Sequence, residues 1–154
     1  MELSMGINTE NRIEITQSLS ELLADTYILY IKTQNYHWNV TGIYFKYLHE
    51  LFEEHYTEMA QAIDEIAERI RALGEYTPGS YQQFSQLSTI KETTTIPNWK
   101  EMLTNLLQDH EQIVNTARTA LKLASKYEDE VSVGLLTERM SVHEKTAWVL
   151  RSHL

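Results

Sequence analysis

Histidine and carboxylate side chains recur at helical spacing between residues 49 and 68. His49 is followed by Glu53 four positions later, and Asp64 is followed by Glu68 at the same interval. Because an α-helix turns about 100° per residue, all four side chains fall within one stripe about 100° wide. Imidazole and carboxylate groups without sulfur suit iron, manganese or zinc, and the large carboxylate share favours iron or manganese.

The two pairs are too far apart along one helix to hold the same ion. His49 and Asp64 are fifteen residues apart, which is roughly 22 Å along a straight helix. In an antiparallel two-fold pairing, the His49 end of one helix would meet the Asp64 end of its mate. Ala60 and Ala67 fall inside the stripe, where small side chains would let that second helix come close. The spacing therefore predicts metal sites shared across a homodimer interface.

His37 and Trp38 precede this helix in the segment HWNVTG. The tight connection would fold the end of a first helix back beside the start of the second, so that His37 can reach the region of His49. Trp38 would then lie beside the metals, where an oxidisable ring could intercept stray radicals. Each group also has an ordinary interpretation, because the acids could solvate a face or pair with Arg69 and Arg71, and the tryptophan could serve packing. Spacing alone leaves both interpretations open.

The elements that must position these groups are helices. Apolar residues at steps of three and four predict a first helix over residues 11–40 and a second over 44–73, with a turn at 40–43. Residues 75–97 form a long polar connector, in which we expect a short helix near Phe84–Ile90.

Two further helices are expected in the remainder of the chain. Asn98 and Glu101 have the spacing of an N-cap and its partner for a third helix ending near Lys126. Asp129 could cap a fourth helix running to about His153. The sequence thus predicts an all-α fold, a four-helix bundle with a short helix in the long crossover between helices two and three.

Composition restricts the class of protein. The 154 residues, 42% hydrophobic and 23% charged, suit a single domain over residues 1–154 with a short acidic N-terminal segment, about 1–10. The chain has no cysteine, which excludes disulfides and thiolate chemistry and fits a reducing compartment. It shows no membrane-spanning stretch and no signal-peptide pattern, so we expect a cytoplasmic protein.

Other motifs do not lead to a site. No Glu-x-x-His occurs, which argues against a di-iron site inside one bundle. The remaining histidines match no ligand pattern and are interpreted as solvated or packed: His55, His110, His143 and His153.

The segment HWNVTGIYFKYLHELFEEHYTEMAQAIDEIAERI resembles the Dps family, the mini-ferritins, and the similarity extends over nearly the whole chain. The resemblance implies a ferritin-like four-helix bundle, a hollow dodecamer built from two-fold dimers, and ferroxidase sites with two irons at the dimer interfaces. It implies Fe(II) and hydrogen peroxide as substrates, with peroxide favoured over dioxygen. It implies that Trp38 lies beside the metals and that the catalytic metal ligands are His37, His49, Glu53, Asp64 and Glu68.

The chain departs from the family pattern at three places. Many members have Asp where this chain has Glu53, whose carboxylate reaches one methylene further. Glu130 fits an acidic iron-entry pore, but Gly134 stands where an Asp is often found, so either Glu130 carries the entry field alone or the pore is assembled differently. DNA-binding members carry a Lys-rich tail, whereas residues 1–15 contain no Lys, one Arg and three Glu. Twelve copies at a net charge of −9 would carry about −108, so direct DNA binding is not expected.

The sequence therefore predicts a ferroxidase that stores and detoxifies iron and protects the cell from oxidative damage. Its activity should fall as the pH drops through the range in which histidine takes up a proton. One alternative is a nucleoid-binding cage whose metal site is incidental. Another is a structural or adhesive oligomer whose stripe is a salt-bridged interface. Replacing Asp64 and Glu68 by Ala separates a catalyst, which keeps its assembly, from a structural interface, which should fall apart.

Overall fold

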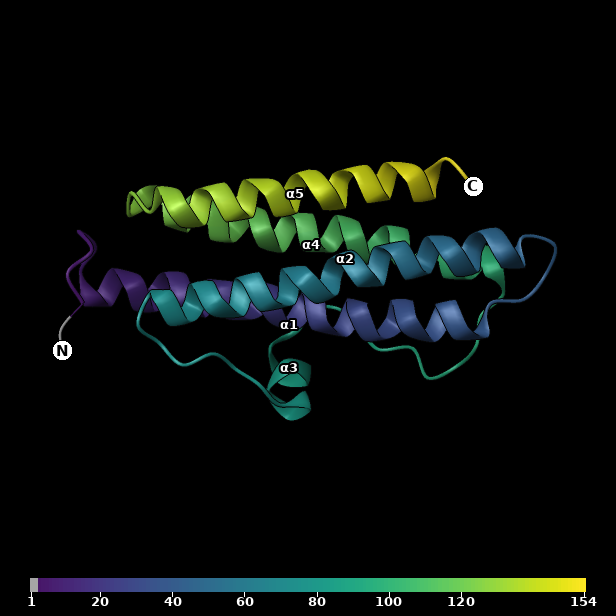
Figure 1. Cartoon of the computed structure of the whole chain (residues 1–154), viewed down its shortest axis with the longest axis horizontal. Helices are drawn as coiled ribbons and strands as arrows, with labels where there is room; N and C mark the ends of the chain where they lie inside the picture. The colour runs from purple at the N-terminus through teal and green to yellow at the C-terminus, as the bar shows by residue number, and fades with distance from the viewer. Residues whose placement is uncertain (1–2) are drawn as a thin grey trace.

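Four long helices lie side by side, and a fifth, short one packs on their outside (Figure 1). The computed structural model describes residues 3–154, and all regular structure in that part of the chain is helical. In chain order the helices are α1 (Thr9–Asn39), α2 (Phe45–Ala72), α3 (Tyr81–Leu87), α4 (Trp99–Lys126) and α5 (Glu130–Arg151). The α1·α2 and α4·α5 pairs form the two halves of the bundle, and α3 contacts α1. The predicted all-α bundle with a helix in the crossover is confirmed.

Local capping sets where the helices begin and end. Asn98 and Glu101 make the predicted reciprocal pair, in which each side chain accepts a hydrogen bond from the other residue's backbone N–H. The Asp129 carboxylate accepts from the backbone N–H of Ser132 at the start of α5. Gly74 follows α2 with φ +100°, a conformation that favours glycine. Of the expected acidic segment at residues 1–10, the first two lie outside the described residues and the last two belong to α1.

The short helix lies three residues earlier than its expected position at 84–90. Ser80 starts it, because the Ser80 side chain accepts from the backbone N–H of Gln83 while the Gln83 side chain accepts from that of Ser80. The helix ends before Ser88, whose hydroxyl donates to the Asp25 carboxylate 2.9 Å away. The connector has no long run of apolar residues at helical spacing. The position of α3 is therefore set by the polar Ser80–Gln83 cap.

Asp25 ties this crossover to the bundle from a fully buried position on α1. Its carboxylate accepts hydrogen bonds from the backbone N–H and hydroxyl of Thr89, at 2.6 and 2.8 Å. The hydroxyl of Thr116 on α4 also donates to it, at 2.7 Å. A buried carboxylate is tolerated when donors surround it in this way. The connector after α3 is thereby fixed against both halves of the bundle.

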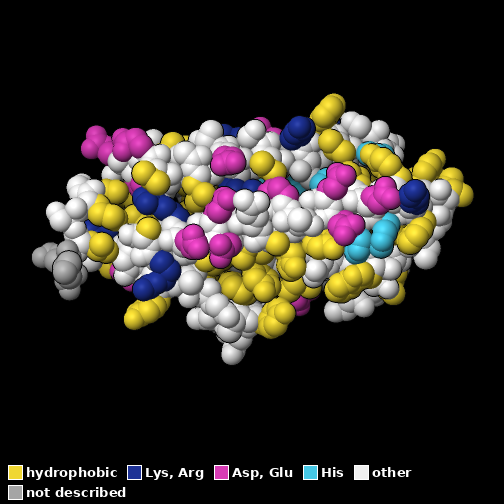
Figure 2. All heavy atoms as spheres, viewed as in Figure 1, with side chains coloured by type: hydrophobic (Ala, Val, Ile, Leu, Met, Phe, Trp, Pro, Cys, Tyr) yellow, Lys and Arg dark blue, Asp and Glu magenta, His cyan; other side chains and the backbone are white. Residues whose placement is uncertain are grey.

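Helix α2 presents one apolar and one acidic face. Leu48, Phe52, Met59, Ile66 and Ile70 are almost completely buried in the core. Acidic side chains follow the opposite face across the view of Figure 2, and histidines join them near the end where α1 meets α2. No helix among residues 3–154 has an apolar stretch that could cross a membrane.

Candidate metal centre

His37, at the end of α1, and His49, early in α2, lie face to face. Their rings stack with centroids 3.8 Å apart and an interplanar angle of 15°. Nδ1 of His37 lies 2.6 Å from the backbone carbonyl oxygen of His49, and Nδ1 of His49 lies 2.7 Å from that of His37. Because a carbonyl oxygen only accepts, each Nδ1 carries a proton, and in the neutral ring it is then Nε2 that keeps the free lone pair. The backbone thus holds both imidazoles in the form that binds a metal through Nε2.

Aromatic rings surround this histidine pair. Phe45 packs against His49 with ring centroids 5.2 Å apart, and Tyr56 meets His37 edge-on at the same distance. His37 is buried at 7% exposure. Trp38 is 65% exposed, and none of the aromatic contacts found among residues 3–154 includes it. The rings that contact the imidazoles are therefore those of Phe45 and Tyr56.

Tyr56 was not predicted from the sequence as a neighbour of the candidate site, although its spacing from His49 could have indicated it. It lies seven residues after His49, which is close to two helical turns and hence on the same side of α2. Burial raises the pKa of the Tyr56 phenol above its ordinary value, and the charges of Glu53 and Tyr30 raise it further. Tyr56 therefore lies within electrostatic reach of a candidate ligand.

The three candidate carboxylates of α2 have exposed side chains: Glu53, Asp64 and Glu68. None of the ion pairs found among residues 3–154 includes any of them. Arg69 pairs instead with the buried Asp129, with Nη2 and Oδ1 2.7 Å apart. Arg71 donates to the backbone oxygen of Glu75. The interpretation that Asp64 and Glu68 pair with these arginines is therefore not supported within one chain.

One protomer brings together only part of the predicted ligand set. No three His, Asp or Glu side chains among residues 3–154 are grouped closely enough to hold a metal ion. Because α2 is unbroken from Phe45 to Ala72, the ends that carry His49 and Asp64 are roughly 22 Å apart. A single chain therefore provides paired imidazoles at one end of α2 and unpaired carboxylates toward the other.

The expected entry residue, Glu130, is the exposed first residue of α5. It follows Asp129, whose ion pair with Arg69 joins this end of α5 to α2. A side chain at Gly134 would have space, because an added Cβ would have no heavy atom within 4 Å. Packing within the chain therefore does not require glycine at the second pore position.

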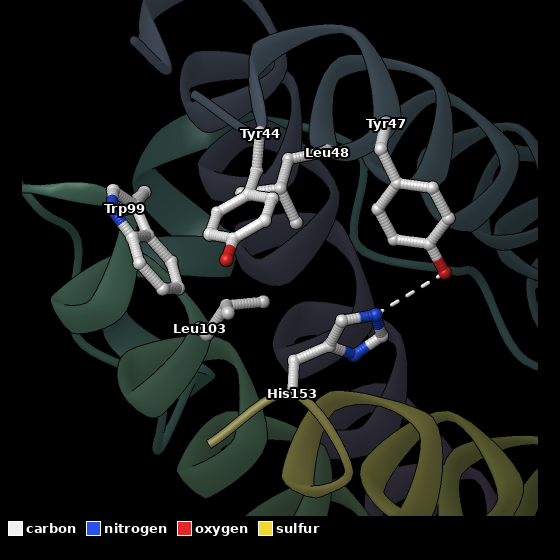
Figure 3. A pocket seen from close by; sticks show the side chains of 6 residues that line it. All are labelled: Tyr44, Tyr47, Leu48, Trp99, Leu103 and His153. Carbon is white, nitrogen blue, oxygen red and sulfur yellow. Dashed lines mark hydrogen bonds between the residues drawn. The ribbon is translucent and has the colours of Figure 1, made fainter. Parts of the chain in front are cut away.

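A separate pocket of about 180 Å³ lies where α2 and α4 begin and the chain ends (Figure 3). Its Tyr47 hydroxyl lies 3.2 Å from Nε2 of His153, and Nδ1 of His153 donates to the backbone oxygen of Val149. In the neutral ring, Nε2 of His153 therefore accepts a hydrogen bond from the Tyr47 hydroxyl. The residues that line the pocket are Tyr44, Tyr47, Leu48, Trp99, Leu103 and His153. This mainly aromatic pocket contains none of the candidate metal ligands.

His110 and His143 are buried between α4 and α5, as packed histidines. Their Nδ1 atoms lie 2.8 Å apart, and Nη2 of Arg139 lies 3.0 Å from Nε2 of His143. Because arginine only donates, His143 accepts at Nε2 and donates its Nδ1 proton to His110. Arg139 itself pairs with Glu58 of α2 at 2.6 Å. Burial lowers the pKa of His110 to about 3 and that of His143 well below its ordinary value, so both rings are neutral.

Comparison with known proteins identifies the family. The ferritin-like domain family matches residues 16–154. An uncharacterised low temperature-induced protein of Nostoc is 41% identical over 154 residues, covering 99% of this chain and 86% of that protein. DNA protection during starvation protein 2 of Bacillus anthracis is 35% identical over 141 residues, 92% of this chain and 97% of that one. The chain belongs to the Dps family.

The Dps fold is equally clear from solved structures. The Dps protein of Vibrio cholerae superposes with a TM-score of 0.92 at 30% identity, covering 98% of both chains. That protein is described as a member of a broad superfamily of ferritin-like diiron-carboxylate proteins. The resemblance and the ferritin-like bundle predicted from the sequence are therefore confirmed. Membership of this Dps family supports iron as the metal, and iron storage and protection as the general function.

Proposed function

We propose that this Dps protein oxidises Fe(II) at di-iron sites shared between two protomers and stores the ferric product in a hollow dodecamer of two-fold dimers. Each site takes His37, His49 and Glu53 from one protomer and Asp64 and Glu68 from its mate. The observation that carries the proposal is the reciprocal histidine pair, in which backbone oxygens occupy both Nδ1 atoms and leave Nε2 of each ring for a metal. The unpaired acids lie at the other end of the same helix, where a second chain in antiparallel orientation would use them.

Each group has a distinct role in the proposed reaction. The neutral imidazoles of His37 and His49 bind Fe(II), and the carboxylates favour the higher charge of Fe(III). Asp64 and Glu68 have no cation beside them within the described chain, so their charge is available to the metal. Hydrogen peroxide takes one electron from each iron, and this paired reduction forms water without releasing hydroxyl radical. Glu53 reaches one methylene further toward the metal than Asp would.

The proposal also covers how Fe(II) enters the cavity and where in the cell the protein acts. Glu130, exposed at the start of α5, supplies the negative field that draws Fe(II) toward the cavity. Gly134 adds no charge, so each chain contributes one carboxylate to this entry. The chain acts as one domain, residues 1–154, in the cytoplasm, where it protects the cell from iron and peroxide.

Anaerobic iron oxidation tests this function directly. Fe(II) is added to metal-free protein, followed by half an equivalent of hydrogen peroxide, while ferric absorbance and spin-trapped hydroxyl radical are recorded. We expect rapid ferric formation, iron that stays soluble and little trapped radical, because both oxidising equivalents are consumed at one site. A parallel run with dioxygen as the only oxidant should be slower. Oxidation no faster than in buffer, with precipitating iron, would refute the ferroxidase.

We also expect no direct binding to duplex DNA at neutral pH and moderate salt. A net charge of −9 per chain and a first segment without lysine repel the phosphate backbone. Gel mobility of linear DNA should be unchanged by the purified, metal-free protein. A clear mobility shift that weakens as salt is raised would instead favour the DNA-binding cage.

A further inference from the structure

Tyrosine rings form a continuous chain of contacts from the candidate metal centre to α3. Tyr56 contacts His37 at a centroid distance of 5.2 Å, and Tyr30 meets Tyr56 at 5.9 Å. Tyr27 then meets Tyr30 at 5.9 Å and Tyr81 at 6.2 Å. All four contacts are edge-on, and all lie within the range at which aromatic rings touch.

The chain is shielded along most of its length and open at its far end. Tyr27, Tyr30 and Tyr56 are partly buried against the core. Phe84 of α3, 5% exposed, stacks on Tyr27 at 4.5 Å and holds α3 against α1. Tyr81 is 69% exposed on the protomer. Hydrophobic side chains, a class that includes tyrosine, gather between α2 and α3 in Figure 2.

Phenols lose an electron more easily than phenylalanine or histidine rings, and electron transfer between groups weakens steeply as their separation grows. Four phenols in successive contact therefore divide the distance from His37 to Tyr81 into several short electron transfers. A single transfer over the whole distance would be much slower. We propose that Tyr56, Tyr30, Tyr27 and Tyr81 form a radical-transfer path that carries one oxidising equivalent from the metal centre to the surface of α3. This inference rests on the proposed function, because iron and peroxide generate the oxidant.

The path operates when a site holds one iron instead of two. Peroxide then takes a single electron from Fe(II) and yields Fe(III), hydroxide and a hydroxyl radical. The radical abstracts the phenolic hydrogen atom of Tyr56, which forms water and a tyrosyl radical. Each later step moves one electron and one proton from the next phenol to the radical, so the radical passes through Tyr30 and Tyr27 to Tyr81. There two tyrosyl radicals couple into dityrosine, or a thiol returns a hydrogen atom and becomes a thiyl radical.

The position of Trp38 makes it a poor member of this path. Its ring is 65% exposed and shares no aromatic contact with Tyr56 or His37 among residues 3–154. Tyr30, by contrast, contacts rings on both sides, and its hydroxyl accepts a hydrogen bond from Nε2 of Gln34 at 3.0 Å. Removing the Tyr30 hydroxyl should therefore interrupt the path while leaving the packed ring in place.

The test compares wild type with Tyr30→Phe and with Tyr76→Phe, a control tyrosine that is 89% exposed, lies beside Arg71 and shares no ring contact with the four tyrosines of the path among residues 3–154. Each protein receives one Fe(II) per proposed site under anaerobic conditions and then excess peroxide. Freeze-quenched electron paramagnetic resonance detects tyrosyl radical, and peptide mass spectrometry locates oxidised tyrosine and dityrosine. Ferric absorbance is recorded in the same mixture. Thermal unfolding verifies that the variants are folded.

We expect Tyr81 products in wild type and Tyr76→Phe, and a severalfold loss of them in Tyr30→Phe, where Tyr56 products rise. Ferric formation should be the same in all three proteins. Tyr81 products that do not depend on Tyr30, or the absence of tyrosine products, would overturn the path. If ferric formation is then still fast, only the path fails. If ferric formation is no faster than in buffer, the proposed ferroxidase fails as well.

Discussion

Co-expression of a His49→Ala chain with an Asp64→Ala/Glu68→Ala chain should restore iron oxidation that neither variant performs alone. Each variant by itself lacks one half of every shared site, and its oxidation rate should fall at least about 100-fold. In a mixed dimer, one site combines the intact histidines of one chain with the intact acids of the other. With random pairing, about a quarter of all sites are complete, and stopped-flow ferric absorbance should recover in that proportion.

The matched control is co-expression of His37→Ala with His49→Ala. Both changes damage the same half of the site, so no mixed dimer contains a complete one and activity should stay absent. Size-exclusion chromatography should show that the variants keep the wild-type assembly, because the proposed role of the acids is to bind metal and not to hold the two chains together. Equal failure of both mixtures would refute a shared site. Assembly lost in Asp64→Ala/Glu68→Ala would favour the structural interface.

Acid should destabilise the metal-free protein through the buried histidines of α4 and α5. Burial lowers the pKa of His110 from 6.5 to about 3 and lowers that of His143 as well, so the folded chain keeps both neutral. Below pH 6.5 the unfolded chain binds protons that the folded chain cannot. Stability is therefore complete above that pH and falls as the pH drops below it, by up to about 1.4 kcal/mol per pH unit for each histidine that stays neutral in the folded chain; for His110 this range extends down to about pH 3. Denaturant unfolding midpoints across this range measure the slope.

A variant pair isolates the source of the acid effect. The double variant His110→Leu/His143→Leu should have a much weaker pH dependence, even if its stability at neutral pH is lower. Val131→Thr, which changes an exposed residue at the start of α5 and no ionisable group, should keep the wild-type slope. His55, whose pKa burial lowers to about 4, would supply what remains in the double variant. An unchanged slope in the double variant would show that other groups cause the acid effect.

Local features of the sequence were sufficient to predict the helices of the bundle. The Asn98–Glu101 cap and the Asp129 cap lie within a few residues of the helices they start, so their spacing could be recognised without the fold. The angular stripe on α2 was equally local, because a regular helix converts residue number into direction and height. The same rule indicated that the candidate ligands on α2 could not meet within one chain. The most specific part of the family resemblance included the same stretch of α2.

Contacts between distant residues decided the rest. The proton on each Nδ1 of His37 and His49 is set by the other residue's backbone oxygen, and this depends on how α1 and α2 meet. The neutral pair His110–His143 depends in the same way on an arginine and on burial between two helices. Residue spacing predicts the direction in which each side chain leaves a helix. It does not predict how another helix packs against that helix, or which side chains are shielded from water. For that reason the sequence determined the helices and candidate ligands, whereas tautomers, buried charges and ring contacts were determined only by the tertiary structure.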